Sequence, residues 1–108
     1  LEHFPKEQLQ RSILPHWRNL LRPDGKFRAI VPDTEAMLIA LKQDQMSYED
    51  FREVIFGAQD YAGDFHFNMF TAASLKKILI QGGFHDVDIL DQGRRNGKCF
   101  EFEILARA

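Results

Sequence analysis

The chain has 108 residues, 44% of them hydrophobic, and a formal net charge of −2 with acidic and basic residues interspersed. This predicts one domain or part of one, excludes bulk disorder, and gives no indication of a nucleic-acid partner. No apolar run approaches the roughly 18 residues of a membrane span, and the single Cys99 cannot form an internal disulfide, so we expect a cytoplasmic protein with no membrane partner.

The first elements are a helix and a strand. Apolar residues at helical spacing predict an amphipathic helix over Lys6–Leu21, which Pro15 should kink or split. Turn-forming residues at Pro23–Gly25 end this helix. Phe27–Val31 follows as a short apolar strand.

The middle of the chain contains two further helices and an irregular segment. Asp33 or Thr34 can cap a helix that runs to about Lys42, and we interpret Asp33 as a cap rather than a catalyst. Ser47–Asp50 is typical of the start of another helix. Residues 57–68, rich in glycine, aspartate and aromatic residues, are expected to be irregular.

The last part of the chain predicts a helix and a hairpin. Thr71 caps a helix that ends at Gly82-Gly83. Val87–Leu90 forms a strand, Asn96-Gly97 a tight hairpin turn, and Lys98–Leu105 the returning strand.

These elements predict an α/β fold in which the first and second strands are parallel. The returning strand should lie between Phe27–Val31 and Val87–Leu90, antiparallel to both. Because ligands of open α/β sheets lie outside the carboxyl ends of strands, function should be sought near Pro32-Asp33. The outer edge of Phe27–Val31 would have no partner in this chain, so we also expect a homo-oligomer formed through that exposed edge.

Short motifs lie in a fixed order along the whole chain: Leu1-Glu2-His3, Leu20–Phe27, Phe56–Gln59 with Asp64–His66, and Phe70-Thr71 through Gly83-Phe84. Together they resemble the carboxyl-terminal half of a class I S-adenosylmethionine-dependent methyltransferase, closest to the small predicted methyltransferases of sugar and cell-envelope gene sets. The resemblance implies strands five, six and seven of a Rossmann-like sheet, with strand seven antiparallel.

The same resemblance implies that residues 1–108 are the carboxyl-terminal part of a single methyltransferase domain whose amino-terminal, cofactor-binding half is absent. The family's glycine-rich loop and its ribose-binding acidic residue have no counterpart here. Asp24 also replaces a glycine of the family's helix-to-strand turn. We therefore expect the intact parent to bind S-adenosylmethionine and the fragment alone to be inactive.

The implied function is methyl transfer to a small molecule, such as a saccharide. His3 and His66 are the candidate catalytic residues, as general base or as groups that orient the acceptor. Leu1 and Glu2 would lie at the cofactor. The alternative for both histidines is a structural hydrogen bond in a loop, and the alternative for the whole chain is a non-catalytic, methyltransferase-like interaction module.

No metal site is expected from the sequence. The four histidines, at positions 3, 16, 66 and 85, show no ligand spacing, and no second cysteine accompanies Cys99. The aromatic residues Phe65, Phe67 and Phe70 can line an acceptor pocket, or pack the irregular segment onto the core.

Overall fold

The computed structural model describes all residues from 1 to 108. Its elements are, in chain order, α1 (Lys6–Gln8), the π-helical segment η1 (Leu9–Ile13), α2 (Leu14–Leu20), β1 (Lys26–Pro32), α3 (Thr34–Lys42), α4 (Tyr48–Phe56), α5 (Ala72–Gln81), β2 (His85–Asn96) and β3 (Cys99–Arg107). None of the helices has the length and apolar character that crossing a lipid bilayer requires.

The predicted break in the first helix is present as a π-helical turn. The backbone N–H of Leu14 donates to the carbonyl of Leu9, and α2 begins there with Pro15 in its first turn. Proline has no N–H to donate and its ring crowds the carbonyl four residues earlier. The wider turn of η1 accommodates this irregularity without ending the helix.

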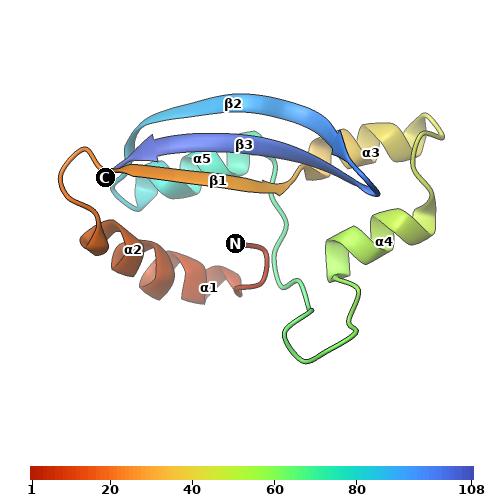
Figure 1. Ribbon diagram of the computed structural model, residues 1–108, viewed down its shortest axis with the longest axis horizontal. Helices are drawn as coiled ribbons and strands as arrows, with labels where there is room; N and C mark the ends of the chain where they lie inside the picture. Colours follow the sequence, from red (N-terminus) through yellow and green to blue (C-terminus); the bar gives the residue numbers. More distant parts are fainter.

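The sheet has three strands in the order β1-β3-β2, and β3 is antiparallel to both neighbours (Figure 1). The predicted arrangement of the strands is thereby confirmed: β1 and β2 are parallel, with the last strand between them. The strands are longer than predicted, because β2 continues through several register shifts to the hairpin at Asn96. The outer edge of β1 has no strand partner, as expected.

The main core lies on one face of the sheet. Alternate residues of β1 and β3, such as Val31 and Phe102, are buried in one cluster with residues of η1, α2 and α5. On the opposite face Glu103 is only 6% exposed, and Arg28 donates to its carboxylate at 3.0 Å. Burying this acid is tolerated because its charge is paired.

A second, smaller core joins α3 to α4 at the carboxyl end of β1 (Figure 1). Met37 and Met46 are buried there, and Phe51 and Val54 of α4 pack against them. Tyr48, which shares the helical pattern with Phe51, is instead 63% exposed because it lies at the very start of the helix. This packing fixes the end of α4, from which the irregular residues 57–68 leave.

Candidate functional site

The candidate site lies where the amino-terminal segment meets the irregular residues that follow α4. The backbone N–H groups of Phe67 and Asn68 both donate to the carbonyl of Glu2, at 2.8 and 3.1 Å. The backbone of His66 donates to the carbonyl of Phe56, the last residue of α4, at 2.9 Å. Three segments that are remote in sequence are thus joined by main-chain hydrogen bonds.

Gly57 makes this close approach possible. It is buried and has a φ of +84°, which side-chain-bearing L residues rarely adopt. A Cβ at this position would lie 2.2 Å from the carbonyl oxygen of Asp64, which is far inside van der Waals contact. Only glycine therefore lets the chain turn at the end of α4 and return to place His66 beside it.

The side chains of Glu2, His3 and His66 converge at this junction. Glu2 Oε1 lies 3.9 Å from His3 Nε2 and 4.0 Å from His66 Nε2, and one potential ligand atom from each residue lies within 4.8 Å of the others. The two imidazole rings meet edge to face, with centroids 4.6 Å apart. The other carboxylate oxygen of Glu2 contacts the amino group of Leu1 at 3.3 Å.

The orientation of His66 is set by the backbone of α4. Its Nδ1 lies 2.6 Å from the carbonyl oxygen of Val54. A carbonyl only accepts hydrogen bonds, so Nδ1 carries the proton and the neutral ring keeps its lone pair on Nε2. That nitrogen faces Glu2 and His3. The His66 side chain is 13% exposed and that of Glu2 18%, whereas His3 is more open at 42%.

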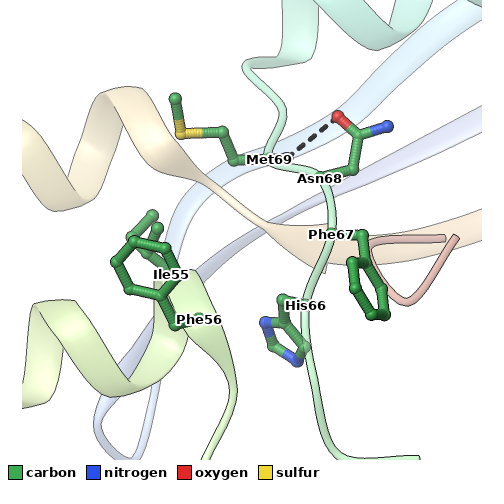
Figure 2. A pocket seen from close by; sticks show the side chains of 6 residues that line it. All are labelled: Ile55, Phe56, His66, Phe67, Asn68 and Met69. Atoms are coloured by element: carbon green, nitrogen blue, oxygen red, sulfur yellow. Dashed lines mark hydrogen bonds between the residues drawn. The ribbon is translucent and has the colours of Figure 1, made fainter. Parts of the chain in front are cut away.

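A cavity of about 320 Å³ opens beside His66. Figure 2 shows Ile55 and Phe56 of α4 on one side of it and the extended residues 66–69 on the other. The lining is mostly apolar, and the imidazole of His66 and the amide of Asn68 are its polar groups. Apolar cavities with a few well-placed polar groups are typical of small-molecule sites.

A second, much smaller cavity of about 10 Å³ lies behind the first. Pro32 and Thr34, at the carboxyl end of β1, line it together with Glu2 and His66. The Oγ1 atom of Thr34 and the Nδ2 atom of Asn68, which also lines this space, are buried without a hydrogen-bond partner in the chain. The space fits one water molecule, which these polar groups could hold.

The structure brings together three of the four residues that the sequence named as site residues. His3 and His66 are adjacent, and the carboxylate of Glu2 lies near both. The side chain of Leu1 is 4% exposed and packs against the main core, so only its backbone can face a ligand. The roles predicted for Leu1 and Glu2 toward a methyl donor stay predictions.

The other predicted residues lie outside the group formed by Glu2, His3 and His66. Asp33 caps α3, as interpreted, by accepting from the backbone N–H of Ala36 at 3.1 Å. Phe65 and Phe67 stack on each other with ring centroids 6.5 Å apart, and Phe67 lines the larger cavity. Phe70 is buried in the main core and also lines the smaller cavity.

The contribution of Asn68 and of the Val54 carbonyl was not predicted, because no sequence motif marks a backbone carbonyl or a lone amide. The groups with shifted pKa values also lie outside this site. A hydrogen bond with Asp86 raises the pKa of His85, and burial raises the pKa of the Cys99 thiol to about 11.

Comparisons with protein-family models, curated proteins and solved structures find no match to this chain.

Proposed function

We propose that this chain forms the acceptor-binding part of an S-adenosylmethionine-dependent methyltransferase that acts on a small molecule, such as a saccharide. The observation that carries the proposal is the pair His3 and His66 at the carboxyl end of β1, beside a mostly apolar cavity. The position agrees with the general placement of ligands in α/β sheets. The strand order β1-β3-β2 agrees with the order that the sequence resemblance implies.

The cavity suits an acceptor better than a cofactor. Its lining offers aromatic and aliphatic side chains, one imidazole and one amide, which can pack against the carbon skeleton of a small molecule and hydrogen-bond its hydroxyl groups. It offers no glycine-rich backbone to approach a nucleoside closely. We therefore assign the cavity to the acceptor rather than to the cofactor.

His66 is the better placed general base of the pair. Its Nε2 carries the lone pair, and the Val54 carbonyl fixes the ring. It can take the proton of an acceptor hydroxyl as that oxygen becomes the nucleophile, and Glu2 Oε1 can then stabilise the resulting imidazolium. His3, which is more exposed and lies against His66, can orient the acceptor. S-adenosylmethionine, when bound, supplies the electrophilic methyl group.

A non-catalytic, methyltransferase-like interaction module is the second candidate function. The stacked and exposed rings of Phe65 and Phe67, 38% and 62% accessible, favour it because exposed aromatic residues are frequent at protein interfaces. An interaction module would transfer no methyl group. Its binding to a partner protein would not depend on the imidazole of His66.

The experiment is a methyl-transfer assay on the full-length parent chain that contains these residues. Titration calorimetry first measures S-adenosylmethionine binding, and transfer of radiolabelled methyl to a panel of sugars and other hydroxyl compounds is then followed. We expect binding, transfer to at least one acceptor, and no transfer by residues 1–108 alone. Absence of cofactor binding by the parent would support the module instead.

The matched variants are His66→Ala, His3→Ala and the control His16→Ala. His16 is an exposed histidine of α2 that lines none of the cavities described above. Loss of a positioned general base lowers turnover roughly 100-fold or more, so we expect this for His66→Ala, a smaller loss for His3→Ala and none for His16→Ala. Unchanged turnover with a lower melting temperature would identify His66 as structural.

A further inference from the structure

Glu2, His3 and His66 have the chemistry of a metal-ligand set, although their spacing in the sequence gives no sign of it. Two imidazoles and one carboxylate are the three protein ligands of many catalytic zinc sites, which leave a fourth position for water or substrate. Here the three potential ligand atoms lie within 4.8 Å of one another, on segments that main-chain hydrogen bonds join. We propose that these residues bind one divalent zinc ion.

The distances between the potential ligand atoms fit a site whose side chains move closer together when zinc binds. Ligand atoms of tetrahedral zinc lie roughly 3.3 Å apart, given bonds of about 2.0–2.1 Å. The separations from Glu2 Oε1 to the two Nε2 atoms are 3.9 and 4.0 Å, and all three ligand atoms lie within 4.8 Å of one another, so the side chains must draw together before they can bind one ion. His3 is partly exposed and free to make this movement.

The hydrogen bond behind His66 is the second feature of a metal site. Metal-bound histidines almost always donate their other ring N–H to a carbonyl or carboxylate, which fixes the tautomer and the direction of the lone pair. His66 Nδ1 makes this bond with Val54 O at 2.6 Å, and its free nitrogen faces the other two ligands. The bond fixes His66 in a position suitable for a metal ligand.

The surroundings also favour a cation at this point. The carboxylate of Glu2 is mostly buried, and its Oε1 has no hydrogen bond to a backbone donor in the chain. An ion bound there would complete the coordination of this oxygen and would lie next to the cavity that His66 lines.

Zinc binding and base catalysis by the same nitrogen exclude each other, because a coordinated Nε2 has no lone pair for a proton. The zinc proposal stands on the geometry of these residues alone and does not depend on methyl transfer. It is therefore tested by metal binding without cofactor or acceptor, so that its failure leaves the proposed function intact. Because bound zinc would occupy the lone pair that the base needs, zinc should inhibit methyl transfer and a chelator should restore it.

The test is a titration of the tag-free full chain with zinc, followed by calorimetry, and with cobalt, followed by its visible absorption. We expect one equivalent of zinc to bind with a Kd below about 10 µM and cobalt to give a tetrahedral spectrum. Glu2→Gln, His3→Ala and His66→Ala should each weaken binding by at least about tenfold. His3→Ala is the variant least able to disturb folding, because this side chain is exposed.

Two histidine controls separate this site from adventitious binding. His16→Ala removes an exposed histidine, and His85→Ala removes one that contacts Asp24 and Asp86 at 3.2 and 2.8 Å and could bind metal by itself. Both should retain full affinity. Binding that is lost in His85→Ala but kept in Glu2→Gln and His3→Ala, or no zinc binding by the unaltered chain, overturns the proposal.

Discussion

The carboxylate of Asp33 accepts a hydrogen bond from the backbone N–H of Gly93 at 3.0 Å, across 60 positions of sequence. Its other oxygen accepts from the backbone of Ala36 and caps α3. One side chain, 4% exposed, therefore fixes the start of α3 to the irregular part of β2. It also stands directly after β1, next to Thr34, which lines the small cavity behind the candidate site.

We expect Asp33→Ala to lower the free energy of unfolding by about 2–3 kcal/mol, because it removes a helix cap and leaves a second backbone donor without its charged partner. Urea denaturation measures the loss. Ser47→Ala is the matched control: it removes the cap of α4, an exposed hydrogen bond at 3.1 Å, and should cost about 1 kcal/mol or less. Equal losses would show that the bond to Gly93 contributes nothing.

Much of the fold could be predicted from the sequence because its signals are local. The caps at Asp33, Ser47 and Thr71 and the turn at Asn96-Gly97 specify where elements begin and end through hydrogen bonds and dihedral angles within a few residues. The full lengths of β2 and β3 could not be predicted. These lengths depend on the pairing of the two strands with each other. The pairing extends to exposed residues, whose sequence does not alternate clearly between apolar and polar side chains.

The candidate site was predictable only in part. Resemblance to a family indicated His3 and His66 separately, but their distance in sequence hid the contact between them. That contact depends on the backbone bonds to the Glu2 carbonyl and on the turn at Gly57, neither of which leaves a periodic pattern. The convergence of Glu2 with two histidines is thus a property of the tertiary structure.

Gly57→Ala should displace the site more than it unfolds the chain. The substitution forces a Cβ against the Asp64 carbonyl and adds backbone strain of roughly 1–3 kcal/mol. We expect faster amide exchange at His66, whose N–H bonds to Phe56, together with weaker metal binding. Gly97→Ala is the control, since its φ of +62° is strained but its Cβ would meet nothing within 4 Å. Identical exchange at His66 in both variants would contradict the argument.

Cys99 should react slowly in the folded chain. Burial raises the pKa of its thiol from 9.0 to about 11. The reactive thiolate at pH 8 is therefore scarce, and we expect Ellman's reagent to react roughly 10–100 times more slowly than in urea. Equal rates in buffer and in urea would show that β3 opens near this residue.

The same shift has a defined effect on stability. The folded chain holds the Cys99 proton more tightly than the unfolded chain does. The contribution of this thiol to the free energy of unfolding is therefore fully present below pH 9 and is lost as the pH rises toward about 11, the pKa of the folded chain. Urea denaturation across this range should show a steeper decline for the unaltered chain than for Cys99→Ser. Parallel curves for the two proteins would refute a buried thiol as the cause.

The exposed edge of β1 leads to a prediction about association. In the sheet β1 pairs only with β3, and Ile30 on this strand is 51% exposed. Unpaired backbone groups beside an apolar side chain favour addition of a strand from another chain. The segments η1 and α2 pack against a face of the sheet and supply no strand to this edge. We therefore expect residues 1–108 to form a dimer at tens of micromolar, on the order of weak pairing affinities.

Sedimentation velocity distinguishes the dimer from a monomer. Ile30→Lys places a charge beside the free edge, a common means by which natural sheets resist edge pairing, and should return the species to a monomer. Leu38→Lys, which adds the same charge at a similarly exposed apolar residue of α3, should leave the dimer intact. Amide exchange along β1 then gives an independent reading, because strand addition protects its outward N–H groups. A single monomer boundary with fast exchange along β1 would show that this edge stays unpaired.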